Sequence, residues 1–181
     1  MRHRFTVVQY DRMIEVGILT DRNQFELLRG EIMTVAPVGV HHTACVDRLA
    51  ELFVRTLATW ASVRVQGPIQ LGVDSLPQPD LAILRQRSDG DGGKYPQAQD
   101  VWALVEVADT TIVFDRSVRV LLYAQGQIPE VWVVDLTVGA VHVYRNPSAT
   151  GYGWVQIMCP GEAIAFQAFP NISFTVDQLL N

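Results

Sequence analysis

The sequence predicts an α/β fold in which helices flank a mixed β-sheet. Three observations favour it: helical and strand-like segments alternate, three strand-like segments are almost wholly apolar, and helical stretches separate several of them. The apolar segments are 81–84, 104–107 and 131–134. Strands of this kind are typical of a central sheet that is covered on both faces. At 181 residues, 49% of them hydrophobic, the chain is long enough for one well-buried core, and we expect one domain over residues 1–181.

The N-terminal part predicts a helix and then a β-hairpin. Apolar residues recur at helical spacing from Thr6 to Leu19, and Thr6 is a suitable N-cap. Strand-like runs at 25–28 and 31–35 flank Arg29-Gly30. A two-residue connection that contains glycine is typical of a hairpin.

The longest amphipathic helix is predicted from His42 to Ala61, where apolar residues recur every three or four positions. Short strand-like runs follow at 63–66 and 69–73 and lead into the first apolar strand. Residues 88–93, rich in glycine and aspartate, predict a flexible connector.

The C-terminal part predicts another helix and several strands. Residues 115–125 have one apolar face, with Asp115 in the first turn or at the cap and Gly126 after the end. The strands that follow are predicted as a pair at 131–135 and 141–144 and as edge strands at 154–158 and 172–174, with a short helix at 176–180.

Composition limits the possible functions. The formal net charge of -5 argues against binding to nucleic acid by bulk electrostatics, so any contact with DNA must be local. Candidate basic residues for such contacts are Arg85, Arg87, Lys94, Arg116 and Arg119. No apolar stretch approaches the roughly 20 residues that span a bilayer, and we expect a soluble, cytoplasmic protein without a membrane partner. Cys45 and Cys159 are far apart and suggest neither a disulfide framework nor a zinc site.

Two acidic residues accompany the apolar strands. Asp80 immediately precedes Leu81, and Glu106 stands between Val105 and Val107. Carboxylates in such surroundings need compensation for lost hydration, which a divalent cation supplies when two of them meet. Magnesium suits two carboxylates together with the backbone carbonyl of Val107, and manganese is a possible substitute.

Other interpretations of these two acids remain open. Asp80 follows a proline and could be an ordinary turn residue. Glu106 could point to solvent from a half-exposed strand. Two carboxylates could also hydrolyse a glycoside without metal if they flank the substrate at roughly 5 to 9.5 Å.

Six segments resemble, in order, the restriction endonuclease family called Uma, which is abundant in cyanobacteria. The segments are Phe25 to Glu31, Pro37 to His42, Gln78 to Asp80, Val105 to Thr111, Asp115-Arg116 with Tyr123-Ala124, and Ile128 to Asp135. The resemblance runs from about Thr6 to the C-terminus. Since that family is part of the PD-(D/E)XK nuclease superfamily, it implies a restriction-endonuclease-like fold and metal-dependent hydrolysis of DNA.

The resemblance also implies roles for particular residues. Asp80 and Glu106 would bind magnesium, Glu31 would supply a further acidic group, and His42 matches the histidine of the family at the start of the long helix. The lysine of the superfamily normally lies two residues after the second acid, where this chain has Ala108. In this family it appears four residues before the tyrosine, where this chain has Arg119.

The arginine leaves two functions open. Arg119 can clamp a phosphate oxygen or orient water, but it stays protonated and cannot act as a general base, and it could instead pair with Asp115. The leading interpretation is a magnesium-dependent DNA endonuclease, with a homodimer as the simplest way to cut both strands. The alternative is a catalytically impaired nuclease-like domain that serves as a nucleic-acid-binding or assembly module. Without metal, mutual repulsion should raise the pKa of at least one clustered acid.

Overall fold

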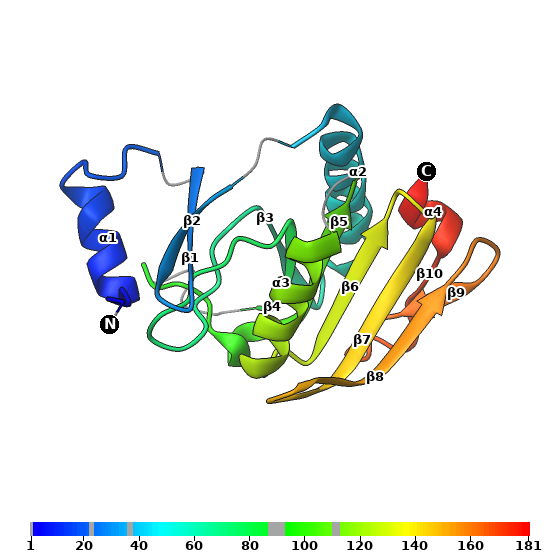
Figure 1. Ribbon diagram of the computed structural model, residues 1–181. Helices are drawn as coiled ribbons and strands as arrows, with labels where there is room; N and C mark the ends of the chain where they lie inside the picture. Colours follow the sequence, from blue (N-terminus) through cyan, green and yellow to red (C-terminus); the bar gives the residue numbers. More distant parts are fainter. Residues whose placement is uncertain (1, 22–23, 36–37, 87–92, 110–112) are drawn as a thin grey trace.

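The computed structural model describes residues 2–21, 24–35, 38–86, 93–109 and 113–181, and in 113–117 the backbone only. Its main sheet has six strands in the order β3-β4-β5-β6-β7-β8 (Figure 1). The strands are β3 (Ala61–Val65), β4 (Leu81–Arg85), β5 (Val101–Ala108), β6 (Glu130–Asp135), β7 (Ala140–Ser148) and β8 (Gly151–Met158). Since β5 and β6 are parallel and the other neighbours antiparallel, the predicted mixed sheet is confirmed.

Alternation along the central strands gives the sheet two apolar faces. Val105 on β5 packs with the residues of α2 (Val40–Leu57) and α4 (Val176–Leu180), whereas its neighbour Leu104 packs with those of α3 (Val113–Gln125). A small sheet of β9 (Ala163–Ala165) and β10 (Ser173–Thr175) joins the α2 side. Period-two alternation with both faces covered explains why the central strands are apolar throughout.

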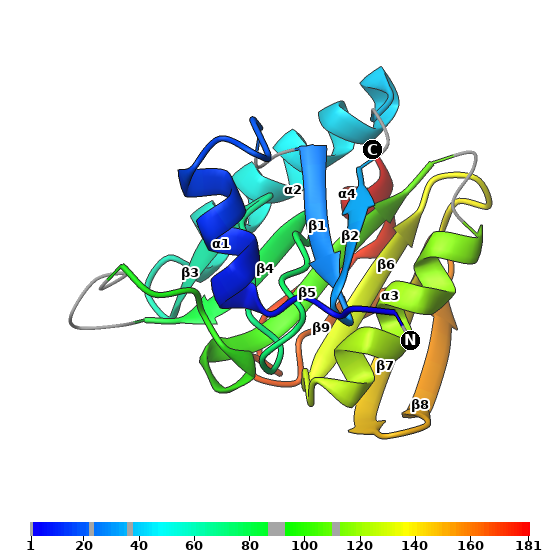
Figure 2. The ribbon, with the colours of Figure 1, turned by 60° about the vertical axis from the view of Figure 1, so that its left-hand side comes forward.

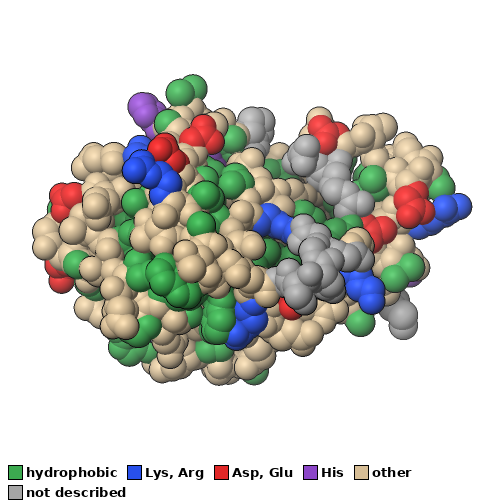
Figure 3. Space-filling model, turned by 180° about the vertical axis from the view of Figure 1, so that it is seen from behind, with side chains coloured by type: hydrophobic (Ala, Val, Ile, Leu, Met, Phe, Trp, Pro, Cys, Tyr) green, Lys and Arg blue, Asp and Glu red, His purple; other side chains and the backbone are tan. Residues whose placement is uncertain are grey.

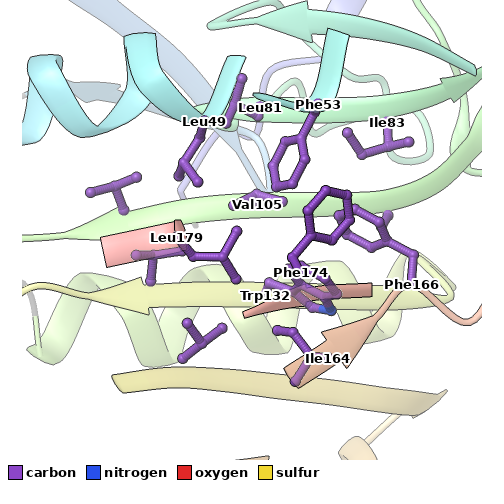
Figure 4. Close-up of a cluster of buried hydrophobic side chains, with 14 of the residues drawn as sticks. Leu49, Phe53, Leu81, Ile83, Val105, Trp132, Ile164, Phe166, Phe174 and Leu179 are labelled. Atoms are coloured by element: carbon purple, nitrogen blue, oxygen red, sulfur yellow. The ribbon is translucent and has the colours of Figure 1, made fainter. Parts of the chain in front are cut away.

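Aromatic rings fill the core between α2 and the sheet (Figure 4). Trp132 of β6 stacks on Phe166 with ring centroids 3.8 Å apart, and Phe53 of α2 meets Trp132 edge-on at 6.3 Å. Phe174 of β10 closes the group at 5.2 Å from Phe53. Aromatic pairs in these geometries contribute roughly 0.5–1.5 kcal/mol each beyond the area that they bury.

The N-terminal segment forms α1 (Val7–Glu15) and the hairpin β1 (Phe25–Leu28) with β2 (Glu31–Thr34), which lies between α1 and α3 in Figure 2. Thr6 caps α1 as predicted, accepting a hydrogen bond from the backbone N–H of Gln9. The predicted two-residue turn is also confirmed, since Arg29 and Gly30 both have positive φ, 51° and 77°. Tyr10 of α1 donates its hydroxyl proton to the carbonyl of Phe25 at 2.8 Å and so joins the helix to the hairpin.

Several predicted boundaries were wrong. Helix α1 ends at Glu15 and not at Leu19. Helix α2 runs from Val40 to Leu57 and not from His42 to Ala61, because Ala61 pairs with Arg85 and begins β3. Three-residue β9 was not predicted, because so short a run has no recognisable alternation.

The predicted strand at 69–73 was also wrong, and only isolated bridges occur there. Leu71 N–H donates to the carbonyl of Ser75 at 2.9 Å, and Gly72 between them has a φ of 66°. The apolar run therefore forms a tight turn. Most of the predicted connector 88–93 lies outside the described residues.

None of the described helices combines the length and the apolar character that crossing a membrane requires.

Candidate active site

Asp80 and Glu106 lie side by side on the sheet. Leu81 of β4 pairs with Val105 of β5, so the residue before Leu81 stands opposite the residue after Val105. Side chains directly opposite in an antiparallel pair point to the same face. The N–H of Asp80 donates to Glu106 Oε2 at 3.4 Å, and the N–H of Val107 donates to Asp80 Oδ2 at 2.9 Å. The interpretation of Glu106 as a solvent-facing residue is wrong, since its side chain is only 13% exposed.

His42 joins Asp80 from the first turn of α2. Its Nε2 lies 3.0 Å from Asp80 Oδ2, and the imidazole is 4% exposed. The pKa of His42 is raised, mainly by the hydrogen bond to Asp80. Burial lowers this pKa and so opposes the rise, while the charges of Asp80 and Asp109 add to it. His42 therefore holds one oxygen of Asp80, while the described residues offer no hydrogen bond to the other.

Glu106 is buried beside Tyr123 of α3, whose hydroxyl donates a short hydrogen bond to Glu106 Oε1. Burial is the largest cause that raises the pKa of Glu106 to about 8, and the charge of Asp80 adds to it. Arg119 and the Tyr123 hydrogen bond lower that pKa. Burial and the negative Glu106 also raise the pKa of Tyr123 well above its ordinary value, so its proton stays on the phenol.

Arg119 occupies the space between α3 and the hairpin. Its Nη1 and Nη2 donate to the two oxygens of Glu26 at 3.1 and 2.6 Å, and Nη1 lies 3.8 Å from Glu106 Oε1. Glu26 is 2% exposed and also accepts the backbone N–H of Gln78 at 2.8 Å. The predicted alternative partner of Arg119, Asp115, has its side chain outside the described set.

The acid that the hairpin brings to Arg119 is Glu26 and not Glu31. Alternation places both on one face of the hairpin, but Glu31 lies at the turn end, where it is exposed. Glu26 lies on β1 farther from the turn. Beside it, the carbonyl of Leu27 accepts the N–H of Leu76 at 2.6 Å and fixes the hairpin against the segment that leads to Asp80. Among the described residues Glu31 has no hydrogen bond or ion pair with the site, and the expectation for it is corrected accordingly.

Sequence reasoning missed two residues of this group, Glu26 and Tyr123. Glu26 carries the same signal that identified Glu106, an acid inside the apolar run Phe25–Leu28, and it could have been found that way. Tyr123 was noted only as part of a segment that resembles the family and was given no role, since a buried phenol has no distinctive sequence pattern.

The cluster has more acids than bases. Glu26, Asp80 and Glu106 face one arginine and one histidine, and burial makes each unbalanced charge expensive. The expected rise of one acidic pKa is confirmed at Glu106, with a different main cause: burial outweighs repulsion by Asp80.

A divalent cation fits the donor set. Two carboxylates on one face, with the carbonyl of Val107 between their strands, are hard oxygen donors such as magnesium prefers, with water in the other positions. A dication would also favour the ionised form of Glu106, which burial disfavours. In the described part of the chain no three His, Cys, Asp or Glu side chains gather as ligands, so the described residues supply at most two carboxylates at this place.

One face of the molecule shows how charge is distributed (Figure 3). Where this face is not covered by grey, basic side chains stand singly or in small groups, some of them beside acidic ones. Lys94, the single lysine, is exposed and has no ion pair with the site among the described residues. This distribution agrees with a net charge of -5 and with local contacts to any polyanion.

Comparisons with known proteins give the family of the chain and its fold. A family model described as "Uma2: Putative restriction endonuclease" matches residues 7–177. A crystal structure from Anabaena variabilis ATCC 29413, titled as a "putative nuclease belonging to DUF820", superposes with a TM-score of 0.76 and 14% identity over 97% of each chain. No curated protein matches the chain. The structural match confirms the fold class expected from the resemblance.

Proposed function

The chain belongs to the Uma2 family of restriction endonuclease-like proteins, and on that premise we propose that it is a metal-dependent endonuclease that hydrolyses phosphodiester bonds of DNA. The observation that carries the proposal is the pairing of Asp80 with Glu106 on one face of β4 and β5. All of residues 1–181 would act as one domain.

In this proposal Asp80 and Glu106 hold a magnesium ion together with the carbonyl of Val107. When bound, the ion supplies an acidified water and neutralises charge on the phosphate. His42 keeps one oxygen of Asp80 occupied and so turns the other toward the site. Tyr123 fixes the orientation of Glu106 by its hydrogen bond.

Arg119 stabilises charge and does not accept a proton. Its guanidinium stays protonated at any pH that the protein survives. Glu26 holds it through two hydrogen bonds, which fixes its direction before substrate arrives. Fixed donors of this kind are effective because they need no reorganisation during the reaction. Glu26 is then a positioning residue that acts through Arg119.

The alternative is an impaired nuclease domain that binds nucleic acid or assembles with a partner. It is favoured by the same pairing, since Glu26 neutralises much of the charge that Arg119 could offer to a phosphate. The glycosidase interpretation has less support, because Asp80 N–H donates to Glu106 Oε2 and Val107 N–H donates to Asp80 Oδ2, so the two acids lie side by side on adjacent strands. Glycosidase carboxylates instead flank a substrate that lies between them.

The test is cleavage of supercoiled plasmid DNA with magnesium or manganese by the parent, Asp80→Asn and Glu106→Gln. We expect each variant to lose roughly 10³-fold in rate, about 4 kcal/mol of transition-state stabilisation. Glu31→Gln, an exposed acid on the hairpin, is the matched control and should cleave like the parent.

Two results would count against the proposal. If Asp80→Asn cleaves as fast as the parent, the metal mechanism is wrong. If the parent binds manganese but cleaves neither DNA nor RNA, the impaired module is the better interpretation. A magnesium preference and a DNA preference belong to the proposal and are tested with it. The expected homodimer needs a separate measurement of mass in solution.

A further inference from the structure

We propose that β8 is the surface through which two copies of this chain associate, by antiparallel pairing of their β8 strands. This inference concerns the far edge of the sheet and does not rest on the proposed nuclease activity.

The first reason is that one side of β8 has no partner in the described structure. β8 is the last strand of the main sheet and forms its outer edge in Figures 1 and 2. β7 pairs with its inner side from Val141 to Ser148. From residue 153 to 158, the outward backbone groups form no hydrogen bond with any described residue. An edge of this kind is a template for another strand.

The second reason is that β8 lacks the usual protection against pairing. Natural edge strands carry charged residues or proline, or are very short. β8 is eight residues long, and its sequence GYGWVQIM contains neither a charge nor a proline. The opposite edge strand β3 has five residues and includes Arg64. Only β8 therefore combines length with an uncharged sequence.

The third reason is the apolar surface beside this edge. Val155 is 52% exposed and Ile157 is 56% exposed, and as alternate residues they lie on one face of β8. A two-fold copy would bring the same pair from its own β8 to this face. Cross-strand contacts between β-branched side chains would then add to the backbone hydrogen bonds.

A second copy fits this edge better than a charged partner. An antiparallel pair of identical strands is two-fold symmetric, as closed dimers require. The protein as a whole carries a net charge of -5, so two copies repel unless they meet at a neutral surface. The uncharged β8 is such a surface. Since β5 is the third strand inward from β8, both candidate sites would stay outside the contact.

The experiment measures mass in solution by light scattering during gel filtration, at about 100 µM. We expect the parent at twice the mass of 20.2 kDa, and Val155→Lys and Ile157→Lys at the single mass. Val8→Lys is the matched control, because Val8 is also an exposed valine (78%) but lies on α1. It should remain dimeric.

Folding of each variant is checked by its melting temperature. Hydrogen exchange of residues 151–158 in the unmodified parent gives a second measurement, with faster exchange expected on dilution to the monomer. A parent that is monomeric at this concentration overturns the proposal. So does a dimer that survives both β8 substitutions, or one that Val8→Lys dissociates.

Discussion

Two buried glutamates in the described part of the molecule each pair with an arginine, and the surroundings of the two pairs differ in charge balance. Glu130 accepts from Nε and Nη2 of Arg145 at 2.9 and 2.7 Å, from Trp132 Nε1 at 2.8 Å, and from Gln167 N–H at 2.6 Å. One acid there meets one base, and both carboxylate oxygens are occupied. Glu26 and Arg119 make a similar pair, but Asp80 and Glu106 add two acids beside it.

The difference separates a structural ion pair from a candidate functional site. A buried pair whose hydrogen bonds are all made costs little and fixes the strands that carry it. A buried cluster with one more acid than bases keeps the extra acid protonated near neutral pH, as the raised pKa of Glu106 shows. Such a cluster is stable only because the rest of the fold holds it, which is typical of sites that bind a cation.

The largest expected effect comes from breaking the balanced pair. Arg145→Met leaves Glu130 buried without its base, and we expect the free energy of unfolding to fall by about 3–5 kcal/mol. Urea unfolding at pH 7 measures it. Manganese affinity of the folded variant should match the parent, because the pair lies outside the candidate site.

Arg55→Met is the control for this substitution. Arg55 pairs with Glu51 on the surface of α2, where both side chains are more than 70% exposed, so the change should stay within about 0.5 kcal/mol. If Arg145→Met unfolds at the same urea concentration as the parent, the Glu130 pair is not the structural element described here.

The next effect is a change in the pH dependence of stability. Folding raises the pKa of Glu106 from 4.5 to about 8, so the folded state keeps a proton that the unfolded state releases. Without metal, stability should fall as pH rises from about 4.5 to 8, at up to about 1.4 kcal/mol per pH unit, and level off above it. Glu106→Gln removes this group and should be more stable than the parent at pH 8.

Urea unfolding at pH 5, 6, 7 and 8 in EDTA measures this slope. His42 also has a raised pKa and loses its contribution as pH rises, so a smaller decline should remain in Glu106→Gln. Glu31→Gln should keep the whole slope of the parent. A parent whose stability is flat or rising from pH 5 to 8 contradicts the account of Glu106.

Part of the candidate site and of the fold around it could be predicted from the sequence. Asp80 and Glu106 stand in or beside apolar runs, and this identified them as acids that need compensation. The register of β4 on β5, which places them on one face, came from the structure. The hairpin and its turn follow from Arg29-Gly30. The apolar runs and the turn are local features, so short-range patterns predict them.

The rest depended on long-range docking. Glu26 and Glu31 lie on the same face of the hairpin, and the docking of the hairpin on residues 74–78 decides which of them reaches the site. The balanced Glu130 pair could not be recognised either, because Arg145 and Gln167 come from distant segments. No sequence pattern within either element fixes those distances.

A smaller effect is expected from Tyr123→Phe, which removes one hydrogen bond from Glu106 without changing its burial. Since that bond lowers the pKa of Glu106, its loss should raise this pKa further and weaken manganese binding at pH 7 by roughly tenfold. Calorimetry with manganese measures it. Tyr152→Phe is a control, because Tyr152 donates to the carbonyl of Ile128, away from the site. Equal weakening by both variants would mean that Tyr123 has no specific role.

The smallest expected effect distinguishes charge from geometry at Arg119. Arg119→Lys keeps one positive charge near Glu26 but loses the two-point hydrogen bond, so we expect about 1 kcal/mol less stability and a cleavage rate reduced by less than tenfold. Arg119→Met, which leaves Glu26 unpaired, should lose far more of both. A cleavage rate that rises in Arg119→Lys would show that a compact charge serves the reaction better than the guanidinium. It would also mean that the Glu26 pair restrains the site, as the balanced Glu130 pair restrains its strands.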